Sequence, residues 1–161
     1  GDPILREECL TVEKVDYGIR KLMDDMAQTM YHNRGVGLAA PQVGVKQRVI
    51  VVDGGTGLIC IANPAILLRE GKEAKVEGCL SIPGIEVEIR RAAEVTVEGL
   101  DRSGVRFRAF AVRLAGRAVQ HEVDHLDGKL IIDYMSLVQR QFIKKKLLAI
   151  SSQVKSKELP L

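Results

Sequence analysis

The first strong pattern along the chain is a helical one close to the amino terminus. Between residues 13 and 33, apolar side chains recur at intervals of three and four residues, with charged residues between them. This spacing places the apolar side chains on one face of an α-helix. The methionines of this face are interpreted as core residues, because a flexible thioether fills gaps between aliphatic side chains. We predict a helix over 13–33 that begins just after Thr11, whose hydroxyl can accept from the first free amides, and that ends before Gly35-Val36-Gly37.

Short segments typical of β-strands follow this helix. They are rich in β-branched residues or alternate between apolar and polar positions, and they cover 47–53, 58–62, 85–89, 94–100 and 105–111. Asn63-Pro64 is expected to end the second strand, because proline cannot donate to a sheet. The sequence Asp101-Arg102-Ser103-Gly104 is typical of a turn and predicts a hairpin between the last two strands.

Helical periodicity returns in the carboxy-terminal third of the chain. One helix is predicted over about 114–126, closed by Gly128, and a final amphipathic helix over about 137–155. The order of helix, strands, helix and helix predicts an α+β fold. In this fold antiparallel strands wrap around a central helix, with one helix near each end of the chain. Because 161 residues suit one domain and no linker divides the chain, residues 1–161 are expected to form a single domain.

Composition narrows the class of protein without identifying it. Hydrophobic residues make up 46% of the chain and charged residues 28%, as in ordinary globular domains. No apolar run approaches the roughly 18 residues that a membrane span needs. The net charge of +3 gives no indication of direct nucleic-acid readout. The three cysteines do not make an even disulfide set, so we expect a reducing compartment and a cytoplasmic protein.

The segment His121-Glu122-Val123-Asp124-His125 carries the most specific chemical signal, because it fits the pattern H-E-x-x-H. Residues four apart lie on one face of a helix, so both imidazoles can reach the same metal ion. Glu122 then stands beside the ion, where a base for an activated water is needed. A chance match on a solvated helix face is the alternative, but two of the three histidines of the chain fall in this segment.

Two histidines do not complete a catalytic metal site, which normally has three protein ligands and one open position. Cys79 is the remaining candidate, because it follows a glycine that permits close backbone approach and because a thiolate suits divalent transition metals. A small buried hydrophobe is the usual interpretation of a lone cysteine, and it is kept for Cys9 and Cys60.

Three short segments stand out together: GVGLAAPQ from Gly35 to Gln42, EGCLS from Glu77 to Ser81, and HEVDHLDG from His121 to Gly128. They resemble the motifs GxGLAAxQ, EGCLS and HExDHLxG of the peptide deformylase family. The motifs occur in the family's order and at similar separations. One departure is Gly116, inside the helix that carries the third motif, which should cost roughly 0.5–1 kcal/mol relative to alanine.

The resemblance implies roles for particular residues. Cys79, His121 and His125 would bind one divalent metal, and Glu122 would be the general acid/base. Gln42, through its amide, and Leu80, through its N–H, would stabilise the oxyanion. Val36 and Gly37 would present backbone to the substrate peptide, and Leu114 and Ala118 are candidates for the methionine pocket, with ordinary core as the alternative.

The resemblance also implies a reaction, a metal and partners. It implies a hydrolase that removes the N-formyl group from the N-terminal formyl-methionine of newly made proteins, using metal-activated water. Fe(II) is the expected metal, and Zn, Ni or Co suit the same ligands. The cations of the last helix would dock the enzyme at the ribosome, with a merely solvated face as the alternative. The competing enzyme class is an H-E-x-x-H zinc endopeptidase, which would not need Cys79.

Overall fold

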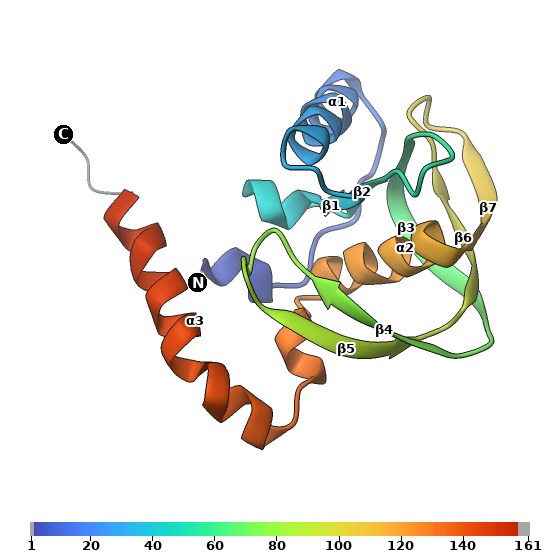
Figure 1. Ribbon diagram of the computed structural model, residues 1–161. Coiled ribbons are helices and arrows are strands. Elements are labelled where there is room, and N and C mark those ends of the chain that lie inside the picture. Colours follow the sequence, from blue (N-terminus) through green and yellow to red (C-terminus); the bar gives the residue numbers. More distant parts are fainter. Residues whose placement is uncertain (1, 158–161) are drawn as a thin grey trace.

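The computed structural model describes residues 2–157 of the chain and shows an α+β fold built around one helix (Figure 1). This helix, α2 (Arg113–Leu126), lies between a five-stranded sheet and a separate hairpin. The amino-terminal helix α1 is Tyr17–His32 and the carboxy-terminal helix α3 is Leu137–Lys157. The predicted fold class and the three predicted helices are therefore confirmed.

Both sheets are antiparallel. The larger has the order β1-β2-β3-β6-β7, formed by Gly37–Ala39, Val49–Val52, Ile59–Glu70, Glu94–Leu100 and Arg106–Val112. The smaller pairs β4 (Glu73–Gly78) with β5 (Glu86–Arg91). Short 3-10 helices cover Pro3–Arg6, Ala40–Val43 and Ile131–Tyr134. The predicted turn between β6 and β7 is confirmed, since Asp101 N–H bonds to the carbonyl of Val105.

The predicted start of α1 near Thr11 is wrong. Asp16 caps the helix, and its Oδ1 accepts from the N–H of Ile19 at 2.9 Å. Aspartate is a stronger N-cap than threonine. The segment before it is held elsewhere, because the N–H of Val12 donates to Asn63 Oδ1 at 2.8 Å.

The predicted end of a strand at Asn63-Pro64 is also wrong, because β3 continues to Glu70. The pairing of β3 with β6 shifts register between Ala62 and Ala65, and Asn63 has a positive φ of 53°. Pro64 therefore lies in a bulge, where its missing N–H costs the sheet no ladder hydrogen bond. Strands β1 and β4 had not been predicted, since β1 has three residues and β4 (EAKVEG) lacks a clear alternation of apolar side chains.

Apolar side chains of all three helices pack against the strands. Met23, Met26 and Met30 of α1 are fully buried against β2, which confirms their interpretation as core. Helix α2 packs Val119, Val123 and Leu126 into a cluster that also contains residues of β2, β3, β6 and β7. A third cluster joins β5 and the loop before it to α3, through Ile143, Leu147 and Ile150. Within 2–157, no helix combines the length and the apolar character that crossing a membrane requires.

Gly116 allows α2 to lie close to the end of β7. A Cβ at this position would be 2.6 Å from the carbonyl oxygen of Ala111, closer than packed atoms approach. Glycine lowers the stability of the helix itself, but it permits this close contact between α2 and the sheet. The contact in turn helps to determine where the histidines of α2 lie.

Candidate active site

Cys79, His121 and His125 converge at one point of the structure. The two histidines lie one turn apart on α2, and Cys79 follows β4 directly. One ligand atom from each residue lies within 4.8 Å of those of the other two. The sulfur of Cys79 is 3.2 Å from Nε2 of His125. The structure thus brings together the three residues that the sequence nominated as metal ligands.

The donor set fits a divalent metal ion. Bond lengths of about 2.0–2.3 Å at tetrahedral angles separate nitrogen and sulfur ligands by roughly 3.3–3.6 Å, close to the 3.2 Å between Cys79 and His125. In the described part of the chain, no fourth His, Cys, Asp or Glu joins the group. Three protein ligands leave one coordination position open, as in catalytic rather than structural sites.

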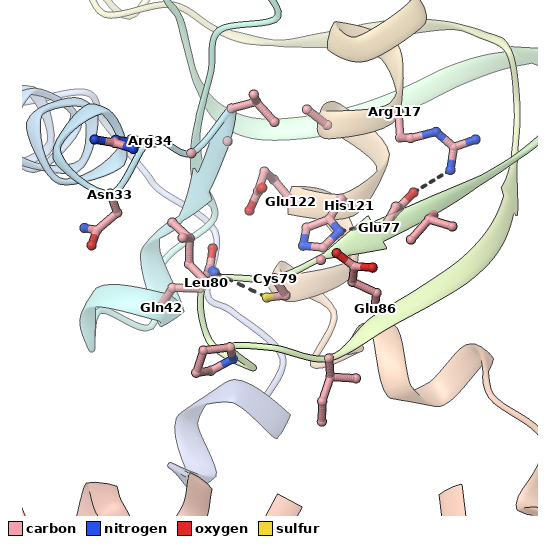
Figure 2. Close-up of a pocket in the computed structure, with 18 of the residues that line it drawn as sticks. Asn33, Arg34, Gln42, Glu77, Cys79, Leu80, Glu86, Arg117, His121 and Glu122 are labelled. Atoms are coloured by element: carbon pink, nitrogen blue, oxygen red, sulfur yellow. Dashed lines mark hydrogen bonds and ion pairs between the residues drawn. The ribbon is translucent and has the colours of Figure 1, made fainter. Parts of the chain in front are cut away.

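Glu77 fixes the orientation of the first histidine. Its Oε2 lies 3.0 Å from Nδ1 of His121, so the other ring nitrogen, Nε2, is directed toward Cys79 (Figure 2). A carboxylate behind a ligand histidine sets the ring's orientation and tautomer and raises its basicity. Strand β4 and helix α2 are thereby joined at the site itself.

Two buried arginines hold Glu77 as a carboxylate. Arg91 forms a bidentate pair with it, at 2.6 and 2.9 Å, and Arg117 donates to its Oε1 at 2.6 Å. Burial opposes the charge on Glu77, but the hydrogen bonds from His121 and both arginines outweigh it and lower its pKa to about 2. Arg117 also donates to the carbonyl oxygens of Ile89 and Glu73, so its own donors are used within the protein.

Asp124, three residues after His121 on α2, extends this network. Arg91 donates to its Oδ2 at 2.9 Å, and the hydroxyl of Tyr134 donates to the same oxygen at 2.6 Å. Burial, and next the hydrogen bond to Asp124, raises the pKa of Tyr134 to about 12. Arg91 thus pairs with both Glu77 and Asp124. Arg117 and Tyr134 had not been singled out.

The two histidines differ in their affinity for protons. Burial disfavours the imidazolium of His121, but hydrogen bonds with Cys79 and Glu77 outweigh burial and raise its pKa to about 10. Burial, with the charge of His121 beside it, lowers the pKa of His125 to about 3. His125 is therefore neutral and ready to donate a lone pair, whereas a metal would displace the proton held at His121.

Glu122 is buried beside these ligands without a partner for one of its oxygens. Its Oε2 has no hydrogen bond among the described residues and almost no exposure. Burial raises its pKa to about 7, against the opposing charges of His121 and Arg91. Space for its carboxylate comes from Gly37 of β1, where a Cβ would lie 2.4 Å from Glu122 Oε1. A carboxyl group with a pKa near neutrality can both accept and return a proton at physiological pH.

Gln42 presents its amide nitrogen to the site. Its Oε1 accepts from the N–H of Ala39 at 2.8 Å, which directs its Nε2 toward Ser81 Oγ at 3.1 Å and Cys79 Sγ at 3.8 Å. Leu80, next to Cys79, is half exposed at the same place (Figure 2). Two candidate donors, one from the 3-10 helix Ala40–Val43 and one from the turn after β4, therefore line the same pocket as Cys79 and Glu122.

Cys79 and His121, together with Glu122, line a pocket of about 630 Å³. Its walls include all four residues nominated for the substrate, namely Val36, Gly37, Leu114 and Ala118. Ala118 is buried, whereas Val36 and Leu114 are partly exposed. The other two cysteines are remote from this chemistry. Cys9 is buried and Cys60 packs against the core cluster of α1, as expected.

Comparisons with known proteins agree with this geometry. A family model described as Polypeptide deformylase matches residues 1–141. A peptide deformylase from Pelotomaculum thermopropionicum is 54% identical over 133 residues, which are 83% of this chain and 86% of that protein. One from Alkalilimnicola ehrlichii is 49% identical over 150 residues, 91% of this chain and 84% of that protein.

Solved structures show the same fold. The crystal structure of a peptide deformylase from Legionella pneumophila aligns with a TM-score of 0.87 and 40% identity, covering 99% of this chain and 95% of that one. The peptide deformylase from Thermotoga maritima aligns with a TM-score of 0.81 and 45% identity, covering 84% of this chain and 93% of that one.

Proposed function

Because this chain belongs to the peptide deformylase family and acts as a peptide deformylase, we propose that it removes the formyl group from the N-terminal formyl-methionine of newly made proteins. The observation that carries the proposal is the arrangement of three ligand residues next to a buried carboxyl group. The ligand atoms of Cys79, His121 and His125 lie within 4.8 Å of one another, beside a buried Glu122 oxygen that has no partner among the described residues. In this proposal residues 1–161 form a single catalytic domain.

Cys79, His121 and His125 would hold one divalent metal ion. Bound there, the ion would act as a Lewis acid that polarises the formyl carbonyl and makes water a nucleophile near neutral pH. A thiolate with two imidazoles suits the borderline metals from iron to zinc. Fe(II) is proposed as the metal, with Zn, Ni and Co as ions that the same ligands accept.

Glu122 would move the protons of the reaction. Its side chain lines the pocket, its Oε2 has no partner among the described residues, and its pKa of about 7 suits a group that first accepts a proton and then returns it. As a carboxylate it takes a proton from the attacking water. As a carboxylic acid it gives that proton to the amine of the methionine, so that formate and a free amino terminus result.

Gln42 and Leu80 would stabilise the negative charge that develops on the formyl oxygen. The Gln42 amide is fixed by its hydrogen bond from Ala39, so its Nε2 needs little reorganisation to donate. The Leu80 N–H would be the second donor. Each donor of this kind is worth about 3 kcal/mol in the transition state.

The walls of the pocket would hold the peptide. β1 is an edge strand of the larger sheet, so the backbone of Val36 and Gly37 can pair with an extended peptide, as in strand addition. Leu114 and Ala118 would contact the methionine side chain, whose flexible thioether suits an aliphatic wall.

The C-terminal helix is the proposed contact with the ribosome. Of its cations, Arg140 pairs with Asp133 and Lys146 donates to the carbonyl of Gly84, whereas Lys144 and Lys145 are exposed. Lys155 and Lys157 have side chains outside the described residues. Lys144→Glu/Lys145→Glu should weaken cosedimentation with ribosomes and spare turnover of a short formyl-methionyl peptide, and unchanged cosedimentation would end this part of the proposal. Because nascent chains carry the formyl group where they are made, we place the activity in the cytoplasm.

Formate release from formyl-Met-Ala by protein prepared without oxygen tests the reaction. Wild type should release formate, and Glu122→Ala should lose at least about a hundredfold in kcat while keeping its metal. Cys79→Ala should lose both metal and activity, which an H-E-x-x-H endopeptidase would not. Equal rates for wild type and Glu122→Ala would refute the proposed role of Glu122.

A further inference from the structure

Two charged side chains at the mouth of the pocket have no ion-pair partner among residues 2–157. They are Arg34 and Glu86, both exposed and both part of the lining. The other charged side chains of the pocket are buried or form ion pairs within the protein. Glu77 and Arg117 pair with each other, and Glu122 is buried. Lys146 of α3 reaches the rim but is bonded to the carbonyl of Gly84. Among the residues that line the pocket, the charges without a partner are therefore Arg34 and Glu86.

These two side chains come from opposite walls (Figure 2). Arg34 follows α1 in the left-handed conformation, with a φ of 55°, and hydrogen bonds at the end of α1 hold this segment. Glu86 begins β5, where Val87 and Ile89 face the core and Glu86 and Glu88 face outward. Each charge is thus placed by a fixed backbone, and no salt bridge joins the two.

An extended peptide brings its side chains to opposite sides in turn. If the formyl-methionine lies at the metal ligands, the next residues of the peptide cross the mouth, and neighbouring side chains meet different walls. We propose that Glu86 and Arg34 select the charges of the second and third residues of the formylated peptide. Glu86 favours a basic residue at one position and Arg34 an acidic residue at the other. This inference rests on the proposed function and adds a substrate preference to it.

Two isomeric peptides test the selection without a change in net charge. They are formyl-Met-Lys-Glu amide and formyl-Met-Glu-Lys amide. General electrostatic steering is the same for both, so a difference in kcat/KM reports the position of each charge. Because each contact is an exposed ion pair, the ratio should differ from one by about two- to fivefold and should approach one in high salt.

Substitutions assign the ratio to the two residues. Glu86→Gln and Arg34→Gln should each bring the ratio of the two kcat/KM values closer to one. Glu86→Lys should reverse the preference, so that the peptide disfavoured by wild type becomes the better substrate. Glu88→Gln is the matched control, since Glu88 lies on the same face of β5 but does not line the pocket. It should leave the ratio at the wild-type value. Formyl-Met-Ala amide is the reference for each variant, so that differences in folding or metal content cancel.

The outcomes separate this inference from the function on which it rests. Turnover of all three peptides with a ratio of one in wild type would overturn the charge selection and leave the deformylase activity intact. A ratio that differs from one but persists in both Glu86→Gln and Glu86→Lys would overturn the role of Glu86. Absence of formate from every peptide would overturn both.

Discussion

At position 37 the chain has room for no side chain beyond hydrogen, because the carboxylate of Glu122 occupies that space. A Cβ on Gly37 would lie 2.4 Å from Oε1 and 2.9 Å from Cγ of Glu122. The φ of Gly37 is not in the left-handed region, so close approach rather than backbone conformation requires this glycine. A residue of β1 thereby sets the position of a residue of α2.

Gly37→Ala should displace Glu122 while leaving the metal ligands in place. A displacement of about 1 Å in a reacting group can cost about a hundredfold in rate. We expect a loss of that order in kcat for formyl-Met-Ala, with metal content near that of wild type. Gly78→Ala is the comparison, because its Cβ would meet only the Ile85 carbonyl, at 4.0 Å. If Gly37→Ala kept the wild-type kcat, catalysis would not depend on the position of Glu122 seen in the structure.

The raised pKa of Glu122 has a consequence for stability in the metal-free protein. Its pKa is 4.5 in the reference state and about 7 in the fold, so the folded state holds a proton that the unfolded state has lost. The contribution of Glu122 to the free energy of unfolding is fully present below pH 4.5 and is lost as the pH rises through about 7.

Glu122→Gln, which cannot ionise, makes this visible. The stability of wild type relative to the variant should fall by about 3 kcal/mol between pH 4.5 and pH 8. Urea unfolding of both metal-free proteins at several pH values measures the difference. A difference that stays constant with pH would mean that Glu122 has an ordinary pKa.

The sequence alone predicted those site residues that lie close together within one motif. The spacing of His121 and His125 on one helix and the position of Glu122 between them predicted their neighbourhood, and the structure agrees. Glu77 and Arg117 are different. Nothing in the local pattern distinguishes Arg117 from a solvated helix residue, and only the tertiary pairing of β4 with α2 buries it against Glu77.

Among the elements, β4, β5 and α2 depend on one another through Glu77. The carboxylate pairs with Arg91 of β5 and Arg117 of α2 and orients His121. The side chains of Glu77, Arg91 and Arg117 are each less than a tenth exposed. Removing one partner from a buried pair leaves the other charge uncompensated in the interior.

Glu77→Gln should therefore be costly in two ways. We expect a loss of about 3–5 kcal/mol in the free energy of unfolding, and metal affinity weakened about ten- to a hundredfold as His121 loses its partner. Chemical denaturation and competition with a chelator measure the two effects. Glu98→Gln, which breaks pairs with Arg106 and Arg108 at the surface, is the control and should change neither appreciably. Equal effects of the two substitutions would contradict the role assigned to Glu77.

The elements that sequence did not predict are those formed by tertiary context. β3 continues through Asn63-Pro64 because a bulge absorbs the proline. β4 exists because β5 pairs with it along its whole length, although its own residues lack an alternating pattern. Helix α1 begins at Tyr17, later than predicted, because the backbone of Val12 is hydrogen-bonded to the side chain of Asn63. In each case a distant partner outweighed the local propensity.

At the scale of the whole molecule, α3 is attached to the body by one side only. Ile143, Leu147 and Ile150 pack on the cluster of Ile82, Ile85 and the strand β5, whereas Phe142 and Leu148 are 85% and 62% exposed. The same cluster includes the partly buried side of Cys79. Helix α3 therefore supports the loop that carries a metal ligand.

Neighbouring leucines of α3 should differ in their effect on stability. Leu147→Ala should lower the free energy of unfolding by about 1–2 kcal/mol, less than for a fully buried leucine because Leu147 is only partly covered. Leu148→Ala should change it by less than about 0.5 kcal/mol. Thermal unfolding of both variants decides the matter, and equal effects would mean that α3 does not pack on this cluster in solution.

The most direct test of the central claim is X-ray absorption spectroscopy of the zinc-loaded protein. The account predicts one sulfur at about 2.3 Å and two imidazole nitrogens at about 2.0–2.1 Å, with one further light atom from solvent. Cys79→Ser should remove the sulfur contribution. A spectrum without sulfur, or one with a second sulfur or a third imidazole, would contradict a site formed by Cys79, His121 and His125 with an open position.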